Sequence, residues 1–218
     1  MNDLDTAPPP WRRFDRSVVR AWVRMVGVFG AVFLPVYFGA GILAANSGRA
    51  SVLAFPFEAH VPLVPWMIWP YLSIGTLFLL PLFHLEVEEI EGLARRMVAA
   101  IVCAGVVFVA LPQRMLFAPR RVDGLEAPFF ALLDAVDTPH NLAPSLHVAI
   151  AGLIVLAVGR RAPAPFAALY GLWFAVLSAS TVLVHQHHLV DVAGGLALAL
   201  VVDAVRPRGA AGRTTTRR

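Results

Sequence analysis

Apolar side chains are concentrated in six runs along the chain, and short polar segments separate these runs. The runs cover roughly residues 23–44, 66–84, 97–111, 145–159, 166–184 and 189–205. A bilayer core of about 30 Å needs about 20 helical residues, so the pattern predicts an all-α integral membrane bundle of about six transmembrane helices. The third and fourth runs are short. We expect them either to extend into flanking residues or to end below the membrane surface, where surrounding protein can satisfy the backbone.

The polar segments at the two ends divide the chain into three predicted parts. Residues 1–22 form a cytoplasmic N-terminal segment that begins polar and proline-rich, which is typical of disorder. Within it, Trp11–Val23 mixes aromatic residues with arginine, as a helix lying at the lipid surface does. Residues 23–206 form the membrane domain, and residues 207–218 form a basic tail that is also expected to be disordered.

The longest connection between apolar runs covers residues 112–143. Within it, Leu125–Val136 has the composition of a short amphipathic helix that could rest on the outer leaflet. Such a helix could act as a lid or as a lipid entrance to a site. It could equally be a plain interfacial connector, and the sequence does not separate these two interpretations.

Composition agrees with a membrane location. Hydrophobic residues make up 58% of the chain and charged residues 15%, whereas soluble domains are about half apolar and about one quarter charged. The net charge is +4 and every basic residue is arginine. These arginines lie between the apolar runs, where they orient a protein in the membrane, so nucleic-acid binding is not expected.

The arginines also predict an orientation. With the N-terminus in the cytoplasm, six spans leave Arg49, Arg114, Arg120 and Arg121 outside and the other fourteen arginines inside. This bias follows the positive-inside rule. We therefore expect a multi-pass protein of the cell inner membrane with both termini in the cytoplasm. Trp66, Trp69 and Tyr71, at the start of the second run, are typical of an interfacial aromatic belt.

Ionisable residues near a membrane are costly and often functional, and three groups of polar residues fall on the same outer side. The first group is His187 and Asp191, which are four residues apart and are neighbours on one helix face if the last helix begins by His187. The carboxylate can then orient one ring nitrogen and leave the other as a nucleophile or base. Alternatively, the pair is structural and joins two helices.

The second group, Ser145 and His147, lies at the start of the fourth run. Proline and serine suit the first turn and the cap of a helix, and free backbone N–H groups there can bind an anion such as phosphate. Ser145 can add a hydroxyl donor, and His147 can donate a proton to a leaving oxygen. The alternative is a helix cap followed by a hydrogen-bonded interfacial histidine.

The third group consists of the outer arginines Arg114, Arg120 and Arg121. Guanidinium groups supply the positive charge that phosphoryl transfer needs around the oxygens of its transition state. Anchoring to lipid headgroups is the alternative interpretation.

A further alternative treats His185, His187, His188 and Asp191 as zinc ligands, because imidazole and carboxylate suit that metal. The interpretation as a phosphoryl-transfer site predicts that no metal and no other cofactor is bound.

Together these residues resemble the type 2 phosphatidic acid phosphatase superfamily. That family has a second motif, Pro-Ser-Gly-His, and a third motif, Ser-Arg-x5-His-x3-Asp. The chain has Pro144-Ser145-Leu146-His147 for the second motif. For the third it has Ser180-Thr181 and then His187 and Asp191 at the same spacing. Arg114-x6-Arg121 matches the spacing of the basic first motif, although Val122 stands where proline is expected and Arg120 is a candidate too.

Two departures indicate a branch of that superfamily. Leu146 replaces glycine, and Thr181 replaces the arginine that helps to hold phosphate. The pattern Pro-Ser-Leu-His-Val-Ala, followed by Gln186-His187-His188 and Asp191, is more similar to the branch that contains inositol phosphorylceramide synthases. Members of that branch transfer a phospho-headgroup between lipids.

The resemblance implies a chemistry in which His187 attacks phosphorus, Asp191 orients His187 and His147 protonates the leaving alkoxide. Water or a lipid alcohol then accepts the phosphoryl group, so the expected partner is a lipid phosphate or diphosphate. Hydrolysis and headgroup transfer both stay open. From a different class, the chain could be a non-catalytic membrane protein for transport or assembly.

Overall fold

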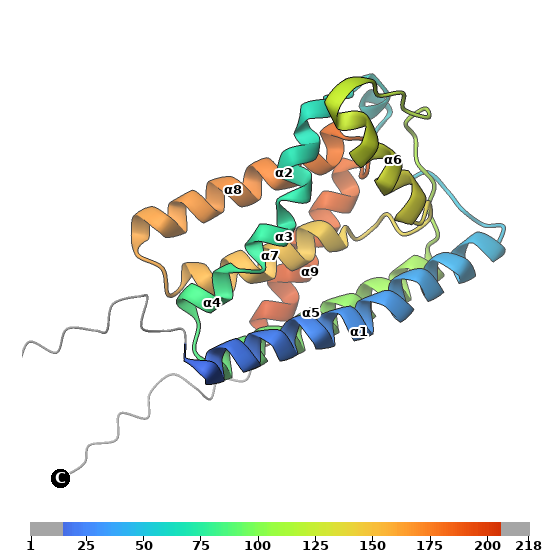
Figure 1. The fold of residues 1–218 in the computed structure, drawn as a ribbon. Helices are drawn as coiled ribbons and strands as arrows, with labels where there is room; N and C mark the ends of the chain where they lie inside the picture. The colour runs from blue at the N-terminus through green and yellow to red at the C-terminus, as the bar shows by residue number, and fades with distance from the viewer. Residues whose placement is uncertain (1–14, 206–218) are drawn as a thin grey trace, which may run out of the picture.

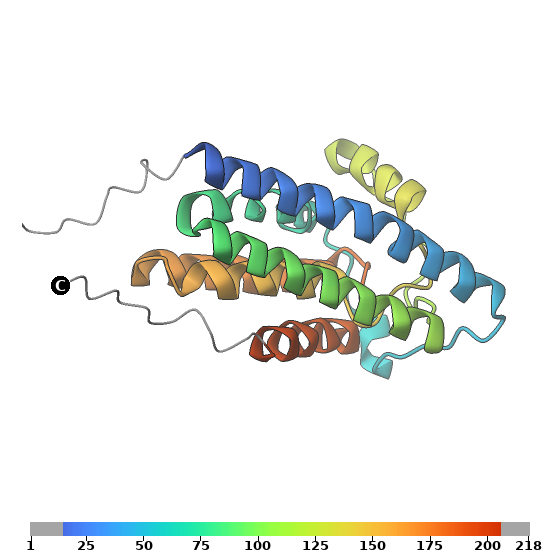
Figure 2. The same cartoon turned by 90° about the horizontal axis from the view of Figure 1, so that it is seen from below.

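The computed structural model describes residues 15–205, which form a bundle of helices (Figures 1 and 2). Within this range no β-strand forms, and an isolated bridge joins Ser51 and Gln113. The predicted all-α class is therefore confirmed. The disorder expected at the two ends of the chain falls on residues 1–10 and 207–218, which lie outside the described residues.

Three helices are long and apolar enough to cross a membrane: α1 (Arg16–Asn46), α5 (Val87–Ala110) and α8 (Ala164–Leu183). They contain the first, third and fifth apolar runs. The third run is short, but α5 begins ten residues before it, because the acidic segment at Glu86 and Glu89 forms a capping box. The short run thus extends into flanking residues, one of the two expected solutions.

Helix α1 has 31 residues and no break at the boundary expected near residue 22. Arg16–Val23, expected in a separate interfacial helix, instead forms the first turns of α1. At 1.5 Å per residue the helix is about 46 Å long, which exceeds the bilayer core of about 30 Å. The first turns, with their arginines, can therefore reach the lipid surface without a separate helix.

Proline divides the second apolar run. It forms η3 (Pro65–Met67), α2 (Ile68–Leu72), α3 (Ile74–Leu77) and α4 (Leu80–His84) instead of one helix. Pro65, Pro70 and Pro81 each lack the N–H that a continuous helix needs. Neighbouring side chains satisfy polar groups near the breaks: Trp22 Nε1 donates to the Phe78 carbonyl at 2.7 Å, and Trp173 Nε1 donates to Ser73 Oγ at 2.8 Å.

The fourth run forms α7 (Leu146–Gly159), a short helix at the centre of the bundle. It contacts α3, α4, α5, α8 and α9 (Leu189–Ala204), and most of its side chains are buried. The apolar residues on all its sides are thus covered by protein. This short run thus corresponds to the second expected arrangement, in which the helix ends inside the bundle.

The predicted helix at Leu125–Val136 is also present, as η4 (Gly124–Glu126) and α6 (Ala127–Val136). Phe130 is buried in a small cluster with Met67, Ile68 and Tyr71, and Phe129 packs edge-on against Trp69, with ring centroids 4.7 Å apart. Helix α6 therefore covers the end of the bundle where α2 begins (Figure 1). The remaining short helix, η2 (Pro56–His60), precedes α2 at the same end.

At the opposite end, Asp203 of α9 pairs with two arginines. Arg96 of α5 and Arg160, which follows α7, both contact its carboxylate. The side chain of Asp203 is only 10% exposed, so this shared carboxylate connects the ends of α7 and α9 with the first half of α5.

Helices α7 and α9 approach each other closely at Gly195. A Cβ atom at this position would collide with the Ser145 carbonyl oxygen and would touch Val148 Cβ. Glycine is required here for this close approach. The contact places the second turn of α9 beside the first turn of α7.

Replacing Gly195 by alanine is therefore expected to destabilise the fold. Gly195→Ala forces the two helices apart, and such overpacking costs about 1–3 kcal/mol. Gly171→Ala is the matched control, because Gly171 of α8 has open space around it and alanine favours a helix interior by about 0.5–1 kcal/mol. Thermal unfolding in detergent micelles measures both variants. Equal midpoints for Gly195→Ala and the wild type would contradict this account of the contact.

Candidate functional site

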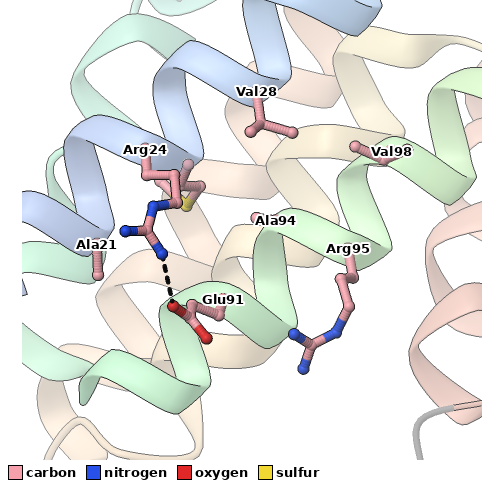
Figure 3. Close-up of a pocket in the computed structure, with 8 residues that line it drawn as sticks. Ala21, Arg24, Val28, Glu91, Ala94, Arg95 and Val98 are labelled. Atoms are coloured by element: carbon pink, nitrogen blue, oxygen red, sulfur yellow. Dashed lines mark hydrogen bonds and ion pairs between the residues drawn. The ribbon is translucent and has the colours of Figure 1, made fainter.

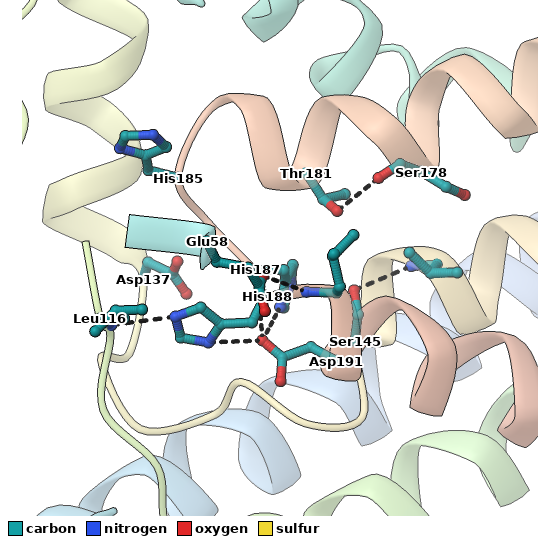
Figure 4. Close-up of polar contacts among 12 residues, drawn as sticks. Glu58, Leu116, Asp137, Ser145, Ser178, Thr181, His185, His187, His188 and Asp191 are labelled. Atoms are coloured by element: carbon teal, nitrogen blue, oxygen red, sulfur yellow. Dashed lines mark hydrogen bonds and ion pairs between the residues drawn. The ribbon is translucent and has the colours of Figure 1, made fainter. Parts of the chain in front are cut away.

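The start of α7, the start of α9 and the loop after α8 meet at one end of the bundle (Figure 4). The Ser145 N–H donates to the Asp191 carbonyl at 2.9 Å, which joins the two helix starts. The Thr181 carbonyl accepts the N–H groups of Gln186 and His187, each at 3.0 Å, which fixes the loop. His147, His187 and Asp191 are thus held at the same end.

His187 and Asp191 are neighbours, as their spacing predicts. His187 Nδ1 lies 3.6 Å from Asp191 Oδ2. The reason differs from the expected one, because α9 begins at Leu189 and His187 precedes the helix. Asp191 turns back in the first helical turn, and its Oδ2 accepts the His188 N–H at 2.7 Å. This capping interaction, which also suits the helix dipole, holds the carboxylate beside the His187 ring.

His188 has the same carboxylate as a neighbour, but its Nε2 is engaged by a backbone N–H and its Nδ1 is buried without a hydrogen bond to any of the described residues. His188 Nε2 accepts the Leu116 N–H at 3.1 Å, so this nitrogen carries no proton in the neutral ring. The proton is then on Nδ1, which lies 3.5 Å from Asp191 Oδ2. His188 is completely buried, so its ring cannot reach a substrate. Its backbone N–H and its ring lie beside Asp191 and hold the carboxylate in place.

His185 is directed elsewhere. Its backbone has a φ of 56°, a left-handed conformation that reverses the chain after α8. The ring stacks on Phe117 with centroids 3.9 Å apart, and Nε2 donates to the Val61 carbonyl at 3.0 Å. Burial lowers the pKa of His185. Among residues 15–205 no set of three or more His, Cys, Asp or Glu side chains could hold a metal ion, so the four zinc ligands considered above do not converge.

His147 lies in the first turn of α7. Its Nε2 donates to the Tyr71 carbonyl at 2.8 Å, and its ring stacks on Tyr71 with centroids 4.1 Å apart. Tyr71 was expected in an interfacial belt with Trp66 and Trp69, but it is buried, because it packs between His147 of α7 and the cluster that contains Phe130. Only the two tryptophans are exposed.

Ser145 caps α7, as the sequence predicts. Its Oγ accepts the Val148 N–H at 3.3 Å, and its own N–H is used by Asp191. Two amides at this helix start are therefore already paired, and Ser145 is fully buried. In this arrangement Ser145 joins the helices, and any anion would have to use the amides that remain.

Of the three arginines predicted to bind phosphate, Arg120 lies at the histidine loop. It donates to the carbonyls of Val184 and His185 at 2.7 and 3.2 Å, and it forms an ion pair with Asp134 of α6. Arg114 and Arg121 are exposed, and neither makes an ion pair within the described range. Spacing alone favoured Arg114 and Arg121, whereas the chain path brings Arg120 to the loop.

Asp137, which sequence reasoning missed, accepts hydrogen bonds from several sides. Its carboxylate accepts the Tyr37 hydroxyl and the Thr138 N–H. With its amide turned so that both ends are satisfied, Gln186 donates to Asp137 and accepts from Arg120. Asp137 therefore connects α1, the segment before α7 and the histidine loop. Its position in a long polar connection gave no signal for this role.

Glu58 of η2 is a second residue that sequence reasoning missed. It is completely buried, and its carboxylate accepts the N–H groups of Phe55 and Leu189, each at 2.8 Å. The second bond caps the start of α9 beside His188 (Figure 4). An isolated acidic residue in an apolar segment was the available signal.

Comparison of the chain with known protein families, with curated proteins and with solved structures finds no match. The chemistry of the site therefore rests on its own geometry. It combines the His187 imidazole, whose side chain is 11% exposed and lies 3.6 Å from a buried carboxylate, with a second imidazole from another helix and a nearby guanidinium. Such a set can provide a nucleophile, a proton donor and a positive charge.

The polar contacts of Asp137 predict a large effect on stability. Asp137→Asn replaces an acceptor oxygen by a donor in a part-buried network, and leaving buried polar partners unsatisfied costs about 1–3 kcal/mol. Asp134→Asn is the control, because it also contacts Arg120 but its side chain is 58% exposed, and exposed pairs contribute about 0–1 kcal/mol. Thermal unfolding in detergent compares them. Equal losses in the two variants would show that the network around Asp137 adds no stability.

Proposed function

We propose that this protein is an integral membrane enzyme that transfers the phospho group of a lipid through a phosphohistidine on His187. The observation that carries the proposal is the different environment of the two adjacent histidines. Both ring nitrogens of His188 face protein partners. His187 directs only Nδ1 towards Asp191, which leaves Nε2 as the nucleophilic atom.

In the first half of the reaction, His187 Nε2 attacks phosphorus. A P–N bond forms, the P–O bond to the leaving alcohol breaks, and the imidazolium form of His147 gives its Nδ1 proton to the alkoxide, because Nε2 is bonded to the Tyr71 carbonyl. Asp191 stabilises the positive charge that develops on the His187 ring, which is the role of the carboxylate in other His–Asp pairs. In the second half, water or an alcohol attacks phosphorus, gives a proton to His147 and releases His187.

Helix α6 and Arg120 suit the binding of such a substrate. Arg120 lies beside the histidine loop, where its charge can act on phosphate oxygens, and it is anchored to α6 through Asp134. Helix α6 has exposed apolar residues, among them Leu125 before it and Leu132 on it. A lipid in the outer leaflet could therefore reach the site past α6.

The proposal includes the arrangement of the chain in the membrane. Six crossing segments are proposed: α1, the broken segment from η3 to α4, α5, α7, α8 and α9. Both termini are placed in the cytoplasm and the histidine site at the outer face, which follows from the arginine distribution. The motif resemblance to the type 2 phosphatidic acid phosphatase superfamily supports the choice of His147, His187 and Asp191 as the reacting residues.

A second candidate function is transfer of a phosphodiester headgroup from one lipid to another. The specific observation in its favour is the charge around the site. Arg120 is already paired with Asp134 and hydrogen-bonded to Gln186, and Thr181 stands where the family has an arginine. A phosphate monoester carries up to two negative charges and a diester carries one, so a site with little free positive charge suits the diester better.

Loss of the nucleophile should abolish the reaction. His187→Ala is expected to lower the release of phosphate or headgroup from lipid phosphates in detergent to background, because no other nitrogen can form the P–N bond. A 32P label on the transferred group should appear on the wild-type protein as an acid-labile adduct and should be absent from this variant. His60→Ala, an exposed histidine at the same end, is the control and should keep full activity. Full activity of a folded His187→Ala variant would reject this nucleophile.

The acceptor separates the two candidate functions. A lipid diester with a labelled headgroup is incubated with the protein, with and without a lipid alcohol. A product that contains the headgroup and the second lipid indicates transfer, whereas free inorganic phosphate from a labelled monoester indicates hydrolysis. Because little positive charge is free at the site, we expect transfer from the diester to be the faster reaction. If every substrate gives no turnover, and His187→Ala has no effect on the cell, the protein is a non-catalytic membrane component.

A further inference from the structure

A groove of about 380 Å³ lies between α1 and α5, towards the end of the bundle opposite the histidines (Figure 3). It has an apolar floor and walls and a charged rim. Ala21, Met25 and Val28 line it from α1, and Ala94 and Val98 line it from α5. The rim is formed by Arg24, Glu91 and Arg95.

The groove follows from the spacing of small residues on two parallel helices. Residues 21, 24, 25 and 28 of α1 and residues 91, 94, 95 and 98 of α5 each share one helix face. Helices α1 and α5 pack against each other over much of their length (Figure 2). Ala21 and Ala94 both line the groove, and their side chains are too short to fill the space between the helices.

The rim has an excess of one positive charge. Arg24 Nη1 lies 3.2 Å from Glu91 Oε1, so these two charges form a pair. Arg95 is exposed and has no ion pair within residues 15–205. Arg24 is the ninth residue of α1, a helix longer than a bilayer core is thick. In the membrane arrangement proposed above, the rim therefore lies in the lipid headgroup region. The apolar floor, formed by Met25, Val28 and Val98, continues from there towards the middle of the membrane.

We propose that this groove binds one anionic glycerophospholipid of the leaflet opposite the histidine site. One acyl chain lies along Met25, Val28 and Val98, and the phosphodiester contacts Arg95, with Arg24 beside it. Basic pockets between transmembrane helices are suited to anionic headgroups, and one phosphodiester charge balances the one unpaired arginine. The inference depends on the membrane placement alone and is independent of the histidine chemistry.

A lipid fits this groove better than a soluble ligand does. Most of the lining is apolar and lies on helices that are long enough to span the bilayer, so the groove opens sideways to lipid. A zwitterionic lipid has the same chains but no net charge to balance Arg95. Selectivity for anionic over zwitterionic lipid is therefore the property that identifies this site.

Native mass spectrometry of the full chain in neutral detergent can measure this selectivity. Phosphatidylglycerol and phosphatidylcholine with identical acyl chains are added in equal amounts, and the ratio of the two bound forms is recorded. We expect the wild type to prefer phosphatidylglycerol. Arg95→Gln should lower the ratio about fivefold, since one arginine near a lipid surface contributes about 1 kcal/mol.

Arg20→Gln is the matched control, because Arg20 lies on the same end of α1 and is exposed but does not line the groove. It should leave the ratio unchanged. Ala94→Leu fills the groove and keeps every charge, so it should remove one bound lipid of either kind. Unchanged thermal midpoints confirm that the variants are folded.

Two results would overturn the proposal. One is a wild-type protein without preference for phosphatidylglycerol. The other is an equal loss of preference in Arg95→Gln and Arg20→Gln, which would indicate general attraction to a basic surface. Because none of these residues lies near His187, the enzymatic proposal can fail or succeed separately, as the phosphohistidine label reports.

Discussion

The close contact between the starts of α7 and α9 is the constraint on which the site depends. Gly195 allows the Ser145 carbonyl to approach α9 without a side chain between them, and the Ser145 N–H bonds to the Asp191 carbonyl. The backbone of Asp191 is therefore fixed by α7, which also carries His147. A change in the distance between these helices would move the carboxylate and one imidazole relative to the other imidazole. Precise placement of this kind is what a reacting centre needs.

The second constraint is that one carboxylate serves two imidazoles. Asp191 Oδ2 already accepts the His188 N–H, and the ring nitrogens of His187 and His188 lie at nearly equal distances from it. The Leu116 amide decides between the rings, because it requires His188 Nε2 to be unprotonated. His188 thus becomes a fixed support and His187 keeps a free nitrogen. The structural difference between these two adjacent histidines thus depends on the N–H of Leu116, which is 72 residues away in the chain.

Local patterns predicted well what depends on near neighbours. The apolar runs, the amphipathic helix at Leu125–Val136 and the spacing of His187 and Asp191 all correspond to observed features, since each depends on residues close in the chain. Tyr71, Asp137 and Glu58 could not be assigned, because their partners are 76, 49 and 131 residues away. The choice of Arg120 over Arg114 and Arg121 likewise depends on how a long connection folds, which no periodicity encodes.

Charge distribution links these findings to substrate choice. Near the histidines, the carboxylates of Asp134 and Asp137 oppose a single engaged guanidinium, Arg120, whereas Arg114 and Arg121 stay at the surface. A dianionic phosphate entering this environment has to displace Asp134 from Arg120 or draw an outer arginine inwards, and it gives up its hydration in either case. A monoanionic diester needs less compensation. The charges around Arg120 therefore support the proposed transfer from a headgroup-bearing lipid, as a separate argument from the motif in which Thr181 replaces arginine.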